Sequence, residues 1–218
     1  MVKLKSATME NVFFLPFVGR DYLSGGIFGQ RVMVLGESHY CGERCAGCGV
    51  PGKAGDCAAF TSGVIERYLD PKAEREPWMN TYLKFERSLV GHETDQAERE
   101  RIWRSLLFFN YLQVAMDETR KAGTHEQYQQ AQKAFYETLD QYRPESVIVW
   151  GKRLWEYLPG DERWRAEEDL VVDGEHVATG SYALDNGQRA RVTAVYHPSA
   201  GYSWDWWHKV ITRFLNLK

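Results

Sequence analysis

Two short segments, far apart in the chain, hold the residues most able to do chemistry. The first is Gly36-Glu-Ser-His-Tyr40, which places a carboxylate, a hydroxyl, an imidazole and a phenol directly after the apolar run at 32–35. The second is His197-Pro-Ser199, which follows another apolar run. Several titratable side chains gathered at the end of a buried strand are typical of a functional site. We therefore expect the two segments to form parts of one site.

A third segment contains all four cysteines of the chain, within seventeen residues: Cys41, Cys45, Cys48 and Cys57. Four thiolates can enclose one tetrahedral ion, and metal binding would supply folding free energy to a loop rich in glycine. Without an export signal, a metal is favoured over disulfides. The pattern favours zinc; an iron–sulfur cluster and unligated thiols remain the alternatives.

The elements that must position these residues follow from the alternation of apolar runs with helical spacing. Strands are expected at 31–35, 106–109, 147–150 and 192–196, and helical patterns occur between them. Such alternation predicts a three-layer α/β/α sandwich with a mainly parallel four-stranded sheet, in one domain spanning 1–218. The Cys-rich loop at 41–57 and a β-hairpin insertion at 170–191 interrupt the pattern. The carboxyl ends of the strands would then bring Glu37, Asn110 and His197 to one edge.

Composition limits the function classes further. The chain has 218 residues, of which 44% are hydrophobic and 26% charged, as expected for a globular protein. It lacks an apolar run long enough for a membrane span or a signal peptide, which predicts a cytoplasmic protein without a membrane partner. The net charge of -3 means that contacts to nucleic acid would need a local basic patch. Candidates for that patch are Arg44, Lys53, Arg67, Lys152, Arg153 and Lys209.

In this order the segments resemble the uracil-DNA glycosylase superfamily. The family pattern has a first-strand turn of Gly-Gln-Asp-Pro-Tyr or Gly-Glu-Ala-Pro-Gly type, an Asn after a second strand, a strand ending in Gly, and a final His-Pro-Ser. This chain has Gly36-Glu-Ser-His-Tyr40, Phe109-Asn-Tyr111, Val147-Ile-Val-Trp-Gly151 and Tyr196-His-Pro-Ser199. It departs from the pattern where His39 replaces the proline and where Ser38 takes the position of an Asp.

The resemblance implies cleavage of the N-glycosidic bond of a flipped-out uracil or damaged base in single- or double-stranded DNA. Glu37 would orient water or stabilise the sugar cation, and His197 would donate to the base carbonyl as negative charge develops. Asn110 would read the base edge, and Tyr40 or Phe60 would stack on the base. The base-binding set implied by the resemblance is Gly36, Ser38, His39, Tyr40, Phe60, Asn110 and Ser199.

Two other functions remain open from the sequence. Gly36-Glu-Ser38 and Asp205-Trp-Trp-His208 loosely resemble the blocks of SGNH-type esterases, with Ser38 as nucleophile, His208 as base and Asp205 orienting the imidazole. The chain is also compatible with a glycosylase-like module that binds nucleic acid without cleaving it. Binding that falls steeply with salt, without base release, would indicate that module.

Overall fold

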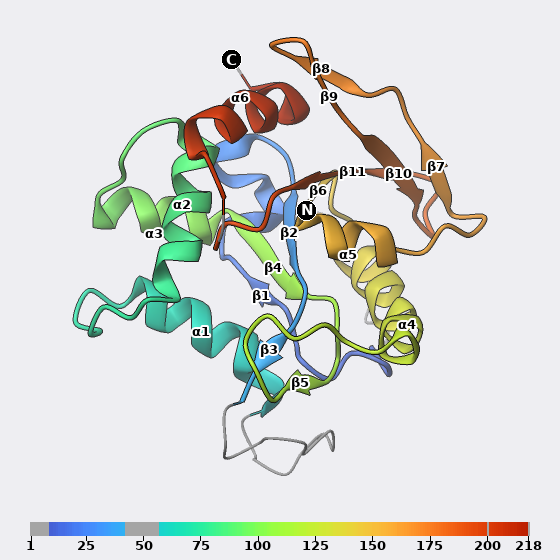
Figure 1. Ribbon diagram of the computed structural model, residues 1–218, viewed down its shortest axis with the longest axis horizontal. Coiled ribbons are helices and arrows are strands. Elements are labelled where there is room, and N and C mark those ends of the chain that lie inside the picture. Colours follow the sequence, from blue (N-terminus) through green and yellow to red (C-terminus); the bar gives the residue numbers. More distant parts are fainter. Residues whose placement is uncertain (1–8, 42–56, 200, 218) are drawn as a thin grey trace.

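The computed structural model describes residues 9–41, 57–199 and 201–217. At its centre is a seven-stranded sheet with the order β1-β4-β2-β6-β11-β10-β7 (Figure 1). These strands are β1 (Phe17–Val18), β4 (Leu106–Asn110), β2 (Val32–Gly36), β6 (Ser146–Trp150), β11 (Arg189–Val195), β10 (Thr179–Ala183) and β7 (Trp164–Ala166).

The sheet is mixed, so the expectation of a mainly parallel four-stranded sheet is wrong. The four strands from β4 to β11 do run parallel, but β1, β10 and β7 pair antiparallel at the two sides. The largest difference comes from the stretch expected to form a separate hairpin insertion. The turn at Asn186-Gly187 returns the chain so that β10 pairs with β11 over five residues, which extends the main sheet.

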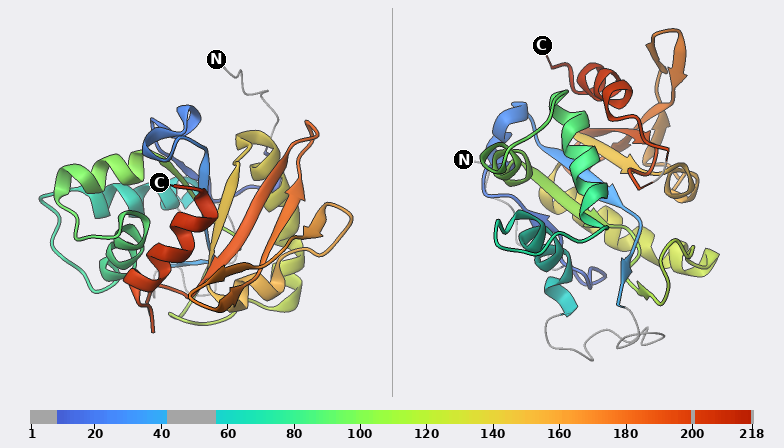
Figure 2. Two further views of the ribbon diagram at one scale, coloured as in Figure 1. Left: turned by 90° about the horizontal axis from the view of Figure 1, so that it is seen from above. Right: turned by 60° about the vertical axis from the view of Figure 1, so that its left-hand side comes forward.

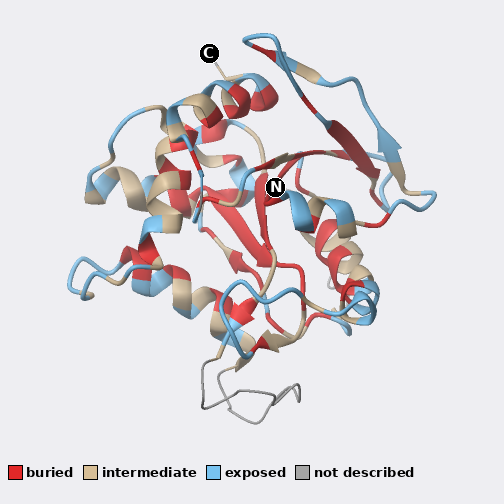
Figure 3. Cartoon of the chain, viewed as in Figure 1, coloured by how far each residue is buried: buried red, intermediate tan, exposed pale blue. Residues whose placement is uncertain are grey.

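Helices cover both faces of this sheet (Figure 2). Along β2, Val32 and Val34 pack in one apolar cluster and Met33 and Leu35 in a second, because successive side chains of a strand point to opposite faces. The first cluster includes residues of α1 (Phe60–Leu69), α2 (Met79–Val90), α3 (Gln96–Arg104) and α6 (Trp204–Leu215). The second includes residues of α4 (His125–Tyr142) and α5 (Lys152–Tyr157). The central strands are therefore buried on both faces (Figure 3).

Local sequence signals explain where several helices begin and end. At the start of α4, the Thr124 side chain accepts from the backbone of Gln127, whose own side chain accepts from the Thr124 backbone. This capping box satisfies two amides that the helix itself leaves unpaired. Gly91 ends α2 with a φ of 80°, the left-handed conformation that glycine adopts without strain. No helix in the described ranges is long and apolar enough to cross a membrane.

Short elements connect the main ones. Two 3-10 turns, η1 (Tyr22–Ser24) and η2 (Gly26–Phe28), lie between β1 and β2, and a third, η4 (Cys57–Ala59), precedes α1. A small hairpin of β8 (Leu170–Val172) and β9 (Glu175–Val177) extends beside α6, which it contacts through β8 (Figure 1). Beyond the carboxyl end of β2, β3 (His39–Tyr40) pairs in parallel with β5 (Ala115–Met116).

Candidate functional site

The carboxyl ends of the four parallel strands form one row. Gly36 of β2 is in register with Asn110 of β4, and Trp150 of β6 is in register with Val195 of β11. Glu37 follows Gly36 directly, and His197 lies two residues beyond Val195. The sheet therefore brings the segments that the sequence singles out to the same edge, where open α/β sheets bind ligands.

Glu37 is the most extensively bonded residue of this edge. Nε and Nη2 of Arg153, at the start of α5, each donate to one of its carboxylate oxygens at 2.8 Å. The hydroxyl of Tyr128 in α4 also donates to Oε1, and the Tyr128 ring stacks on Tyr157 at 3.9 Å between centroids. The carboxylate side chain is 10% exposed, so the bidentate pair offsets the cost of burying its charge. Oε2 accepts one bond from the described residues and keeps acceptor capacity for one further donor.

His197 is held as a neutral imidazole with its donor on Nε2. The backbone N–H of Ser199 donates to Nδ1 at 3.2 Å, and the Ser199 hydroxyl lies 2.8 Å from the same nitrogen. An Nδ1 that accepts leaves the proton on Nε2 in the neutral ring. Burial lowers the pKa of His197; Glu37 opposes this shift, and the guanidinium groups of Arg153 and Arg120 add to it. Glu37 therefore acts electrostatically on His197.

Asn110 is buried against His39 and Gly36. Its Nδ2 lies 3.1 Å from Nδ1 of His39, whose Nε2 is 2.9 Å from the Thr61 hydroxyl. A Cβ on Gly36 would lie 2.2 Å from Oδ1 of Asn110, so only glycine leaves room for the amide at this position. The Asn110 amide group is thus fixed between β2 and the turn after it.

His39 belongs to the core at the edge of the site. It is 5% exposed, and its ring lies 4.9 Å from the ring of Phe14 and 4.6 Å from that of Phe60. Burial lowers the pKa of His39 to about 3, so the imidazole is neutral at physiological pH. Phe60, named from the resemblance as a stacking residue, packs here against an imidazole.

The remaining base-binding candidates lie around the same edge. Ser38 is half-buried, and Ser199 is exposed and bonded to His197. Tyr40 is 41% exposed, and its hydroxyl accepts from the backbone N–H of Arg120 at 3.3 Å. Trp150, 3% exposed, lies edge-on to His197, and its indole nitrogen has no hydrogen-bond partner in the described structure.

The predicted metal centre falls partly outside the described residues. Cys45 and Cys48 lie outside the described residues, whereas Cys41 and Cys57 lie within them and are both half-buried. Within the described ranges, no group of three or more His, Cys, Asp or Glu side chains is arranged to hold a metal ion. Zinc binding by the four thiols therefore stays a prediction from their spacing.

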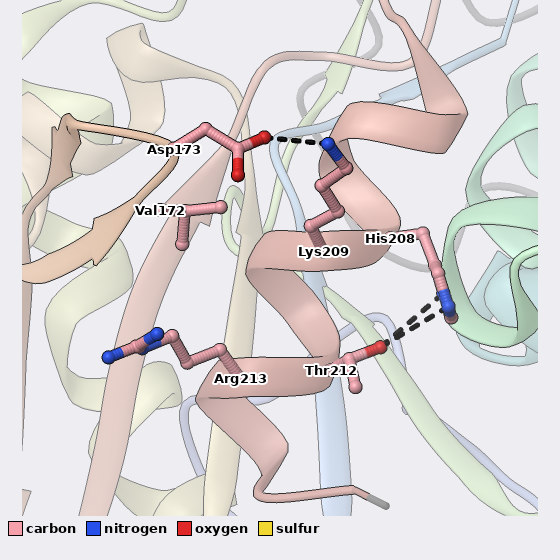
Figure 4. A pocket seen from close by; sticks show the side chains of 6 residues that line it. All are labelled: Val172, Asp173, His208, Lys209, Thr212 and Arg213. Carbon is pink, nitrogen blue, oxygen red and sulfur yellow. Dashed lines mark hydrogen bonds and ion pairs between the residues drawn. The ribbon is translucent and has the colours of Figure 1, made fainter.

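The esterase residues do not form a hydrogen-bonded triad in the described structure. The ring of His208 packs on α2, with Nδ1 3.1 Å from the backbone oxygen of Ser88, and Asp205 accepts from Ser203. His208 also lines an open hollow of about 390 Å³ between α6 and the turn of the β8–β9 hairpin (Figure 4). None of the residues at the strand-end row lines this hollow; its lining residues are Val172, Asp173, His208, Lys209, Thr212 and Arg213.

Three residues that bond within the site were missed or given another role by sequence reasoning. Arg153, a candidate for phosphate contact, also pairs with Glu37, which the sequence did not indicate. Neither Tyr128 nor Arg120 is among the site residues predicted from the sequence. The position of Arg153, two residues after the glycine that ends a buried strand, was the one available signal. Two other basic candidates form ion pairs elsewhere: Arg67 with Glu76, and Lys209 with Asp173.

No family model matches this sequence, and a search of curated proteins finds no match either.

Proposed function

We propose that the protein hydrolyses the N-glycosidic bond of a nucleobase in DNA, with Glu37 and His197 as the catalytic pair. One observation carries the proposal. An anchored carboxylate and a neutral imidazole with its donor on Nε2 lie just beyond the ends of β2 and β11, the two strands that flank β6 in the parallel part of the sheet.

The two groups suit the charges of this reaction. The C–N bond breaks with its electron pair leaving on the base, the water oxygen bonds to the anomeric carbon, and a water proton is released. Nε2–H of His197 donates to the base carbonyl as negative charge develops there. The ionised Glu37 stabilises the positive charge on the sugar, and Oε2 has a remaining lone pair to orient the water.

Base release from single-stranded DNA containing uracil, hypoxanthine or an alkylated base tests this proposal. We expect His197→Ala to slow single-turnover release by about 10²–10³-fold, the usual effect of removing one such donor. Glu37→Gln removes the charge but keeps the shape, and should also slow release. His125→Ala, which removes an exposed imidazole on α4, is the matched control. Absence of release from all three substrates, or equal rates in the wild type and His197→Ala, would contradict the proposal.

The second candidate is a module that binds nucleic acid without cleaving it. The observation that favours it is the set of bonds to Glu37. Tyr128 and Arg153 together use most of the hydrogen-bond acceptor capacity of the carboxylate, which leaves little for water or sugar. Tight, salt-dependent binding of oligonucleotides without base release would select this candidate.

A further inference from the structure

Two further cationic residues adjoin the Arg153–Glu37 pair: Lys152 precedes Arg153 in α5, and the Arg120 carbonyl accepts from Arg153. Arg153 pairs with Glu37, whereas the side chains of Lys152 and Arg120 form no ion pair with any described residue. Both Arg153 and Arg120 are close enough to His197 to affect its pKa. Among the groups named here the three cations outnumber the one carboxylate, although the whole chain has a net charge of -3. Such a local excess attracts anions to this edge of the sheet.

The backbone of Arg120 and the ammonium of Lys152 are positioned by contacts that leave the side-chain charges available. The backbone N–H of Arg120 donates to the Tyr40 hydroxyl, and its carbonyl accepts from Nη1 of Arg153 at 3.3 Å. Lys152 places its ammonium 4.8 Å from the centre of the Tyr196 ring, which is 43% exposed. A cation over an exposed aromatic ring, next to further cations, suits a strand of nucleic acid, with its phosphates and flat bases.

Arg153 can bind a second anion while it holds Glu37. Three of the five guanidinium N–H groups are used, two by the carboxylate and one by the Arg120 carbonyl. The other two, one on each terminal nitrogen, form no further hydrogen bond of normal geometry in the described structure, although Glu37 raises the pKa of Arg153 and the Tyr128 hydroxyl lies near enough to add to that shift. The side chain is 42% exposed, so a ligand can reach it from solvent. Two N–H groups on neighbouring nitrogens match two oxygens of one phosphate.

We propose that Arg153, Lys152 and Arg120 form a phosphate-binding subsite for single-stranded nucleic acid, in which Arg153 bridges the backbone phosphate and Glu37. The proposal rests on the proposed function in naming nucleic acid as the source of the phosphate. The bridge fixes the distance between a phosphate and the carboxylate, and so places the attached sugar beside Glu37. The substrate is accordingly a phosphate-bearing strand, and a free nucleoside is bound poorly.

Fluorescence anisotropy with a labelled thymidine pentanucleotide between 50 and 200 mM NaCl tests the subsite without any turnover. Each phosphate contact on a single strand contributes about -0.7 to the slope of log K against log salt, so three cations predict a slope of about -2. We expect Lys152→Gln and Arg120→Gln each to reduce the slope by about 0.7. Neither change removes an ion pair within the described structure, so folding should be unaffected; circular dichroism checks this.

The matched control is Lys209→Gln, which removes a lysine paired with Asp173 beside α6. Its slope should equal that of the wild type. Slopes unchanged in both Lys152→Gln and Arg120→Gln would overturn the subsite. Displacement of the pentanucleotide by inorganic phosphate at equal phosphate concentration would overturn the assignment to nucleic acid, leaving a simple anion site. Displacement by thymidine as effective as by thymidine monophosphate would overturn the phosphate bridge.

The binding assay separates this inference from the proposed function. Binding with the expected slopes but no base release refutes the glycosidase and leaves the subsite standing. Base release by a protein whose slopes do not respond to Lys152→Gln or Arg120→Gln supports the glycosidase and refutes the subsite.

Discussion

The burial of His39 predicts a specific sensitivity of the fold to acid. The unfolded chain binds a proton at this imidazole below its ordinary pKa of 6.5, whereas the folded protein does so only near pH 3. Between these values the unfolded state binds more protons, so the free energy of unfolding falls as the pH falls. For one such group, the free energy of unfolding changes by about 1.4 kcal/mol per pH unit. His39 alone should therefore lower the free energy of unfolding by about 2 kcal/mol at pH 5 and about 3 kcal/mol at pH 4.

Urea denaturation followed by tryptophan fluorescence at pH 7, 6, 5 and 4 measures this loss. Carboxylates also titrate in this range, so the contribution of His39 is the difference between the wild type and His39→Gln. Glutamine does not titrate, and its amide can replace the bonds to Asn110 and Thr61. His125→Gln, which removes an exposed imidazole that forms no ion pair among the described residues, is the control and should follow the wild-type curve. If His39→Gln loses as much stability in acid as the wild type, the assignment of a buried, neutral His39 is wrong.

Four further predictions concern other parts of the chain. Gly36→Ala places a Cβ against Asn110 and should lower the free energy of unfolding by about 1–3 kcal/mol, as measured by urea denaturation. Gly63→Ala, in a helix and with open space around it, should instead raise that free energy by up to about 1 kcal/mol. In the same assay, Thr124→Ala should lower the free energy of unfolding by about 1 kcal/mol. Thr124→Ser should lower it less, because serine keeps the capping oxygen. Elemental analysis of natively purified protein should find about one zinc ion per chain, and its absence under conditions that prevent metal loss would contradict the cysteine prediction.

The sequence by itself determined the elements whose causes are local. Continuous apolar runs predicted the four parallel strands, because a strand buried on both faces needs apolar side chains throughout. The capping box at Thr124 and the glycine at 91 likewise set a helix start and a helix end, because their hydrogen bonds and backbone angles involve only nearby residues. The candidate site residues after β2 and β11 could also be chosen from the sequence, since polar residues begin abruptly where each apolar run stops.

Tertiary structure alone decided the partners of those residues. Glu37 pairs with Arg153, 116 positions away in the sequence, and Tyr128 reaches the same carboxylate from another helix. His39 looked like a site residue by its type, yet contacts with Phe14 and Phe60 place it in the core. The antiparallel sides of the sheet were likewise missed. Local patterns fix the conformation of a segment, whereas pairing depends on which distant surfaces the whole chain brings together.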